Sequence, residues 1–183
     1  MRLISIYISI FFLVTTNVYS DVTKKIINNL EKASNYGFKF TQRINQNKET
    51  GYCILVFNRK INCLYDRSGK ILVSDGKNLI VKNINSNNSN FYKLKNTSFY
   101  KILDKQYLIN QITKKNVKNE YGKLFTNLNY QNIDIKIFFD EEKLQIKGWK
   151  TTDIYNNSVL TEITIKEVNK IINENIFDLK KFN

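Results

Sequence analysis

The chain contains no histidine, and this absence removes most of the common catalytic centres. Ser-His-Asp and Cys-His catalysis both need an imidazole base, and the usual zinc sites include a histidine ligand. Two cysteines are too few for a closed structural zinc site. Proline is also absent and glycine occurs only six times, so a glycine-rich loop that cradles phosphate groups is not expected.

Carboxylates are the remaining catalytic candidates, and their surroundings do not favour catalysis. Asp140, Glu141 and Glu142 are adjacent, but they lie between two apolar runs, where acidic residues are typical of a solvated turn. The pair Asp75-Gly76 is the one that a type I′ hairpin turn favours. The sequence therefore predicts a protein that is not an enzyme and that uses no cofactor and no metal.

The first twenty residues predict a secretory leader. A basic residue near the start is followed by an almost wholly apolar run over 3–14, and small or modest residues lead up to Ser20. Residues 15–17 are polar and end the apolar run before the ~20 residues that a membrane-spanning helix needs. We expect residues 1–20 to be a signal peptide cleaved near Ser20, which leaves 21–183 as one domain. An uncleaved membrane anchor is the alternative.

The chain is strongly basic. Lys and Arg number 29 against 16 Asp and Glu, and the sequence pI is about 9.6. Such an excess favours anionic partners, whether nucleic acid, anionic lipid or an acidic protein. The lysines are scattered rather than gathered into one block, so we expect a solvated basic surface and no nucleic-acid binding. A basic anion-binding module stays open as an alternative function.

Hydrophobic periodicity predicts one leading helix followed by many short strands. Apolar residues recur at helical spacing over 21–34, and a short helical piece is expected over 98–103. Elsewhere, short apolar segments are bounded by Gly, Asn, Asp or Ser, which is typical of strands joined by hairpins. The predicted strands are 38–43, 52–57, 61–65, 71–74, 79–84, 108–117, 122–127, 133–139, 144–152, 159–168 and 176–179.

Cys53 and Cys63 are expected to face each other. They lie in two apolar runs on either side of a turn at 58–60, and in an antiparallel hairpin centred near residue 58 they are opposite one another. The oxidising compartment that the leader implies favours a disulfide over two free buried thiols. A redox-active thiol is not indicated, because the chain has no Cys-x-x-Cys pair.

Several short motifs occur in a fixed order along the chain. They are F-K-F-T-Q at 38–42, I-L-V-S-D-G-K-N-L at 71–79, N-T-S-F at 96–99, K-I-F-F-D at 136–140 and N-I-F at 175–177. In this order they resemble the LolA family, the periplasmic carriers of outer-membrane lipoproteins. The resemblance is collinear over nearly the whole of the expected mature chain.

The resemblance implies an α+β fold, namely an incomplete (half) antiparallel β-barrel of about ten or eleven strands closed by helices. It implies a monomeric periplasmic carrier, without a cofactor, whose hydrophobic cavity holds lipoprotein acyl chains. The expected partners are outer-membrane lipoproteins, an inner-membrane lipoprotein-releasing transporter, and an outer-membrane acceptor or the membrane itself. A lipid-binding or partner-binding sensor or scaffold that uses the same half-barrel without transport is the alternative.

The resemblance also assigns candidate lipid-binding positions to inward-facing residues of the first strands. They are Phe40, Ile44, Leu55, Phe57 and Ile61. Their period-two spacing places each set on one face of its strand, which is also what an ordinary packed core requires. The only tryptophan of the chain is expected to pack in the core.

The chain departs from the family at the lid of the cavity. The family usually has Arg-Pro before its first hairpin turn, where the arginine holds the lid, and these positions are Phe57 and Asn58 here. Arg59 is close by, and the proline of the family's lid motif is Ser98. How the mouth is closed is therefore not predicted by the sequence.

Overall fold

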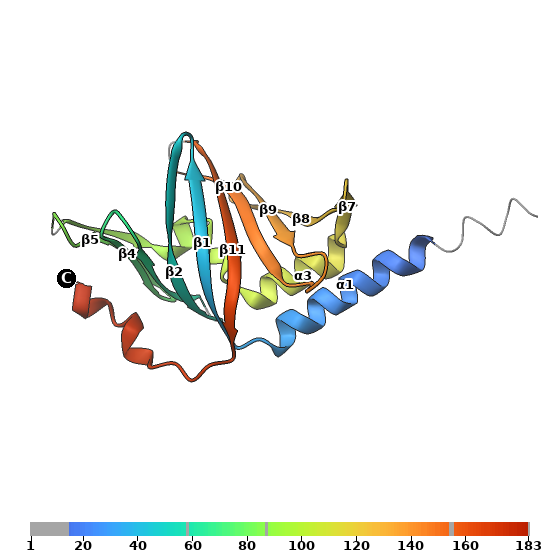
Figure 1. Cartoon of the computed structure of the whole chain (residues 1–183), viewed down its shortest axis with the longest axis horizontal. Helices are drawn as coiled ribbons and strands as arrows, with labels where there is room; N and C mark the ends of the chain where they lie inside the picture. The colour runs from blue at the N-terminus through green and yellow to red at the C-terminus, as the bar shows by residue number, and fades with distance from the viewer. Residues whose placement is uncertain (1–14, 58, 87, 154–155, 183) are drawn as a thin grey trace, which may run out of the picture.

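The computed structural model describes residues 15–57, 59–86, 88–153 and 156–182, with the backbone alone at 15–20 (Figure 1). Most of the expected signal peptide lies outside this part of the chain, so its cleavage stays a prediction. Within the described residues, no helix is both long and apolar enough to cross a membrane.

Eleven strands in the described part of the chain form one antiparallel sheet. The order across the sheet is β6-β5-β4-β3-β2-β1-β11-β10-β9-β8-β7, and the sheet does not close on itself. The strands are β1 (Asn35–Ile44), β2 (Asn47–Val56), β3 (Lys60–Tyr65), β4 (Lys70–Asp75), β5 (Asn78–Asn83), β6 (Asn88–Lys93), β7 (Lys118–Glu120), β8 (Lys123–Tyr130), β9 (Ile133–Phe139), β10 (Ile146–Thr152) and β11 (Ser158–Val168).

The sheet consists of two meanders that join at β1 and β11. Strands β1 to β6 follow one another outward in one direction, and β7 to β11 return to the centre, where β11 pairs with β1. Short turns connect the strands within each meander, and helices connect the two meanders. The predicted fold class is confirmed: the protein is an α+β half-barrel of eleven antiparallel strands in its described part.

The helices occupy the concave side of this sheet and one end of it (Figure 1). Helix α3 packs on both β8 and α1, and Lys105 Nζ at its start donates hydrogen bonds to the carbonyl of Glu31 in the last turn of α1 (3.2 Å) and to that of Ala33 just after it (2.8 Å). The helices are α1 (Thr15–Lys32), α2 (Phe99–Ile102) and α3 (Lys105–Lys115), with 3-10 turns η1 (Leu94–Asn96), η2 (Glu174–Phe177) and η3 (Leu179–Phe182).

Two of the predicted strands are wrong. Of the predicted strand 108–117, residues 108–115 belong to helix α3, where Leu108, Ile109 and Ile112 share the buried face at helical spacing. Asp104 caps this helix, since its carboxylate accepts a hydrogen bond from the Tyr107 N–H at 3.0 Å. Residues 176–179 belong to 3-10 turns rather than to a strand.

Other differences concern the ends of elements and two short strands. Helix α1 begins at Thr15, earlier than the predicted 21–34. Strands β6 and β7 were not predicted, because they are mostly exposed and polar and show no alternation of apolar residues. The hairpin at Asp75-Gly76 is present, but of its two central residues only Gly76 has a positive φ (97°). The turn is therefore not of type I′, which needs a positive φ at both central residues.

The predicted disulfide between Cys53 and Cys63 is present. The two residues are paired directly across β2 and β3, with their Cα atoms 4.0 Å apart. Both side chains are buried on the concave face. Closing a loop of about ten residues in this way stabilises a fold by roughly 2–3 kcal/mol.

The C-terminal segment covers part of the opposite, convex face. Turns η2 and η3 contact β3, β4 and β5, and Asn62 Nδ2 donates a 2.6 Å hydrogen bond to the Ile176 carbonyl. Phe177 is buried there, and Val73 and Ile80 on the same face are fully buried, although none of the three belongs to the concave core. Strands β4 and β5 are therefore covered on both faces.

Candidate functional site

An apolar cavity of about 280 Å³ opens on the concave face of the sheet. Its lining comes from both meanders and from the connection between them, which explains why no single stretch of sequence marks it. The apolar residues that line it include Ile44 of β1, Leu72 of β4, Leu79 of β5, Phe99 of α2, Trp149 of β10 and Val159 of β11.

Aromatic rings close the floor of this apolar cavity. Phe40 and Tyr65 pack edge to face with their ring centroids 4.9 Å apart. Trp149 makes edge-to-face contacts with Phe38 and Phe99, at 6.5 and 6.4 Å. A space of only about 10 Å³ remains beneath these rings, which is at the lower limit for holding even one water molecule.

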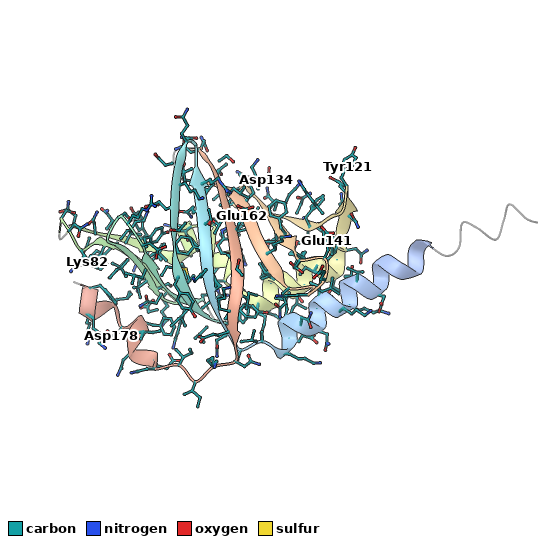
Figure 2. All side chains as sticks on the ribbon, in the orientation of Figure 1. Lys82, Tyr121, Asp134, Glu141, Glu162 and Asp178 are labelled. Carbon is teal, nitrogen blue, oxygen red and sulfur yellow. A yellow bond between two sulfur atoms is a disulfide. The ribbon has the colours of Figure 1, made fainter. Side chains whose placement is uncertain are left out.

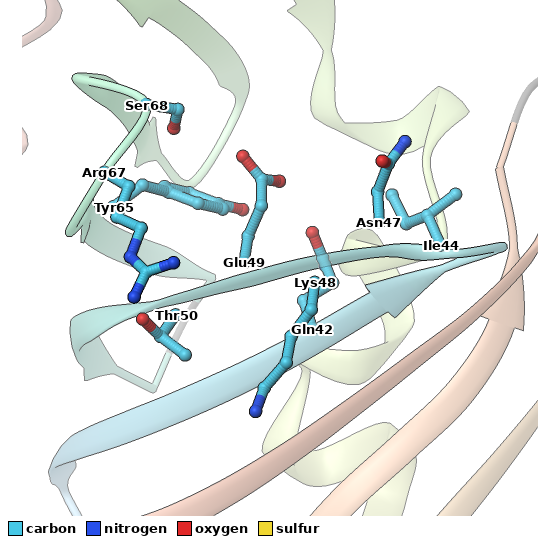
Figure 3. Close-up of a pocket in the computed structure, with 9 residues that line it drawn as sticks. All are labelled: Gln42, Ile44, Asn47, Lys48, Glu49, Thr50, Tyr65, Arg67 and Ser68. Atoms are coloured by element: carbon cyan, nitrogen blue, oxygen red, sulfur yellow. The ribbon is translucent and has the colours of Figure 1, made fainter.

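A second, more polar cavity of about 610 Å³ adjoins the first (Figure 3). The two cavities share Gln42, Ile44 and Tyr65 as lining residues. In the polar cavity the Glu49 carboxylate pairs with Lys70 Nζ at 2.5 Å, and the same ammonium lies 4.1 Å from the Tyr65 ring centroid. Burial, with a smaller contribution from the charge of Glu49, raises the pKa of the Tyr65 phenol. The phenol therefore stays protonated and able to donate a hydrogen bond at neutral pH.

One hydroxyl group in the apolar cavity is buried without a partner. Thr151 is 7% exposed, and its Oγ1 makes no hydrogen bond within the described part of the protein. The hydroxyl of Thr97, which lines the same cavity, donates a 2.8 Å hydrogen bond to the Leu94 carbonyl. Thr151 thus provides a free polar group in a mainly apolar site, where a ligand carbonyl could accept from it.

The short helix α2 that carries Phe99 into the cavity is fixed by charged and aromatic contacts. Arg59, which follows the end of β2, pairs with Asp104 at 2.6 Å and lies 4.3 Å from the Tyr100 ring centroid. The Lys101 ammonium lies within about 5 Å of three tyrosine rings, those of residues 100, 107 and 130. These contacts connect the β2–β3 hairpin, α2, α3 and the end of β8 to one another.

The five predicted lipid-binding residues lie at different depths. Ile44 is partly exposed and lines both cavities, whereas Phe40 and Ile61 are buried in the floor beneath the apolar cavity. Leu55 and Phe57 are buried further along the strands, and Phe57 packs against Tyr36 with ring centroids 5.4 Å apart. Contact of any of the five with lipid stays a prediction.

Sequence reasoning missed most of the cavity wall. Leu72, Leu79 and Val159 were placed in strands, but their convergence on one cavity depends on the order of strands in the sheet. The tryptophan, Trp149, was expected only in the core, and it is both 6% exposed and part of the cavity wall. The sequence could have indicated only which face of its strand each residue occupies, because alternate residues of a strand share a face and all of these residues face the concave side, as Phe38 does.

The described residues bring together no group of three or more His, Cys, Asp or Glu side chains that could hold a metal ion. The candidate site consists of an apolar cavity, a polar cavity beside it, and a few hydrogen-bonding groups between them. Such an arrangement suits a ligand that is apolar at one end and polar at the other.

No protein-family model matches the sequence, and no curated protein matches it at a significant level. Solved structures match it in fold. A putative outer membrane lipoprotein-sorting protein domain from Vibrio parahaemolyticus gives a TM-score of 0.48 and 8% identity, covering 88% of this chain and 97% of that one. A LolA superfamily protein from Nitrosomonas europaea gives a TM-score of 0.44 and 6% sequence identity, covering 89% of this chain and 98% of that one. The lipoprotein LppX from Mycobacterium tuberculosis gives a TM-score of 0.44 and 9% sequence identity, covering 86% of this chain and 98% of that one. The chain is similar in fold to these three structures, one of which is a LolA superfamily protein.

Proposed function

We propose that this protein is a periplasmic carrier that binds the acyl chains of lipoproteins and moves lipoproteins from the inner to the outer membrane. The observation that carries the proposal is the apolar cavity on the concave face, which adjoins a polar cavity through three shared residues. Acyl chains would occupy the apolar cavity, and the polar part of the cargo would lie on the side of Glu49 and Tyr65.

The energetics of acyl chains support this proposal. Exposing an alkyl chain to water costs about 0.8 kcal/mol for each CH₂ group, so an acylated protein needs a carrier to cross an aqueous space. The cavity, at about 280 Å³, is near the small end of ligand sites, which typically measure roughly 300–1,000 Å³. Loading of more than one chain would therefore require α2 and its Phe99 to move outward. A cavity that has to open also gives weaker binding, which handover to an acceptor requires.

Native mass spectrometry of the protein purified from its own periplasm tests the identity of the cargo. Bound acylated protein is expected if the protein is a lipoprotein carrier. Bound free lipid would instead favour the lipid-binding sensor, and a protein without any bound lipid would contradict both. The proposed activity makes and breaks no covalent bond, so the bound species should be chemically intact.

The substitution Ile44→Glu tests the site. Ile44 lines both cavities and is only partly buried, so the new carboxylate can reach water and the fold should survive. A charge beside an alkyl chain is costly to desolvate, and we expect binding of a fluorescent fatty acid to weaken by roughly tenfold or more. Ile61 is less suitable because it is 1% exposed, and a charge there would unfold the protein.

Leu64→Glu is the matched control for this substitution. Leu64 is 53% exposed on the convex face and lines neither cavity, so the same chemical change should leave fatty-acid binding unchanged. Thermal unfolding of both variants checks that they are folded. Normal binding by a folded Ile44→Glu protein would show that this cavity is not the acyl site.

A further inference from the structure

Four basic residues lie in one line across five neighbouring strands on the convex face, with Leu160 of β11 in the line between Arg43 and Lys150. The strand register pairs Lys48 of β2 with Arg43 of β1, Arg43 with Leu160 of β11, Leu160 with Lys150 of β10, and Lys150 with Lys136 of β9. Because paired residues of adjacent strands point to the same side of a sheet, all of these side chains share the convex face. We call the four basic residues the basic row.

One pair within the basic row is unfavourable for the fold. Lys150 and Lys136 are directly opposite each other, and like charges in a cross-strand pair are destabilising. Within the described residues, neither of them pairs with a carboxylate, and the Lys136 ammonium instead lies 4.0 Å from the Phe125 ring centroid. Two lysines placed opposite each other at a cost in stability are expected where their charges bind an anionic partner.

Two carboxylates share this face beside the basic row, those of Glu162 and Asp134 (both labelled in Figure 2), and each already has a partner. Glu162 forms an ion pair with Arg43, and Asp134 accepts a 2.9 Å hydrogen bond from Asn129 Nδ2. Four basic side chains against two carboxylates leave a local excess of two positive charges. The two lysines at positions 48 and 150 are exposed, so this excess is presented to solvent.

The basic row runs along the rim of the lipid site. Arg43 immediately precedes Ile44, and Lys150 immediately precedes Thr151, and both of these neighbours line the apolar cavity. Lys48 itself lines the polar cavity. Successive side chains of a strand point to opposite faces of the sheet. The basic row therefore lies on the convex face, directly behind the strand segments whose concave face lines the cavity.

We propose that the basic row docks the protein on an anionic lipid bilayer, with the mouth of the cavity at the membrane surface. The inference rests on the proposed function, because acyl chains have to be taken from a membrane and handed to one. Three of the four members of the basic row are lysines, whose charges on flexible stems can adapt to many headgroup positions. Each Lys or Arg near an anionic membrane contributes about 1 kcal/mol, and the attraction fades over a Debye length. Docking would therefore be reversible.

The test compares vesicle binding by the wild-type protein and by the double variant Lys136→Gln/Lys150→Gln. Flotation with vesicles of phosphatidylcholine plus phosphatidylglycerol should recover the wild-type protein, and vesicles of phosphatidylcholine alone should not. The double variant should bind the anionic vesicles about tenfold to thirtyfold more weakly, which corresponds to two charges at about 1 kcal/mol each. Raised salt should weaken wild-type binding.

Lys24→Gln/Lys114→Gln is the matched control, with the same change in net charge at exposed positions of α1 and α3. It should bind anionic vesicles like the wild type. An equal loss in both double variants would mean that net charge alone acts and would overturn the proposal. Full binding by Lys136→Gln/Lys150→Gln, or no binding by the wild type, would overturn it as well.

A separate assay distinguishes this proposal from the proposed function. Binding of a dansyl-labelled fatty acid is measured without vesicles for the same proteins. The Lys136→Gln/Lys150→Gln protein should capture the fatty acid normally, since neither lysine lines the apolar cavity. Failure of the wild type to capture it would contradict the acyl-binding function, whereas the flotation result would still decide whether the basic row binds membranes.

Discussion

At the scale of single residues, replacing Thr151, whose hydroxyl is unpaired, should have opposite effects on stability and on ligand binding. A buried hydroxyl without a partner costs about 1–3 kcal/mol, so Thr151→Val should raise the free energy of unfolding of the ligand-free protein by about 1 kcal/mol. If a ligand carbonyl accepts from this hydroxyl, the same variant should bind an acyl ester about fivefold more weakly. Urea unfolding and titration with a fluorescent acyl ester measure the two effects.

Thr97→Val is the control, because Thr97 lines the same cavity but its hydroxyl already donates to the Leu94 carbonyl. Removing that hydrogen bond should lower stability by about 1 kcal/mol. If Thr151→Val destabilises the protein as much as Thr97→Val does, then the Thr151 hydroxyl has a partner in solution, such as a bound water.

Residues whose environment depends on one hairpin were predictable, and residues whose environment depends on the whole sheet were not. Cys53 and Cys63 could be paired because a single turn fixes their register. Ile44 could be placed on an inward face by strand parity alone. Thr151 and Trp149 lie in a strand that was also predicted, but their approach to Ile44 requires β11 to lie between β1 and β10.

At the scale of elements, helix α3 shows how two periodicities can be confused. Leu108 and Ile112 are four residues apart, a spacing that puts two side chains on one face of a strand as well as of a helix, whereas burial of the adjacent Leu108 and Ile109 on one face fits a helix and not a strand. Asp104 is the signal that would have decided between them, because an Asp immediately before such a segment is a typical N-cap. Burial against α1 and β8 then gives the segment the tertiary contacts that a short helix needs.

Asp104 has two roles that substitutions can separate. Its carboxylate caps α3 through the Tyr107 N–H and pairs with Arg59, which is partly buried. Asp104→Ala removes both contacts and should lower the free energy of unfolding by about 2 kcal/mol, of which about 1 kcal/mol comes from the cap. Asp104→Asn keeps the cap and should cost about half as much. Equal losses in urea unfolding would show that the ion pair, and not the cap, holds α3 in place.

At the scale of the whole molecule, the two halves of the convex face differ. The C-terminal turns cover β3, β4 and β5, whereas the basic row lies on the half formed by β2, β1, β11, β10 and β9. The sequence predicted the strands of both halves and the curl of the sheet. It could not predict this division, because the covering segment follows β11 in the chain and contacts strands that lie far from it in sequence.

The packing of the C-terminal turns η2 and η3 on the convex face depends on one buried aromatic residue, Phe177. Phe177 is 3% exposed in a turn that contacts β3 and β4, next to the fully buried Val73 and Ile80. Truncating a buried phenylalanine to alanine typically costs 3–5 kcal/mol, and we expect the lower part of this range for Phe177→Ala because the cluster is small. The variant should also expose apolar surface on β4 and β5, which would increase binding of an apolar dye.

Ile171→Ala is the control for this prediction, since Ile171 is in the same C-terminal segment but is fully exposed. It should leave both the unfolding midpoint and dye binding unchanged. Because the Phe177 cluster is separate from the concave core, Phe177→Ala should retain fatty-acid binding as long as the protein is folded. A Phe177→Ala protein with unchanged stability would show that the C-terminal turns do not cover this face in solution, and the convex sides of β4 and β5 would then be open to a partner.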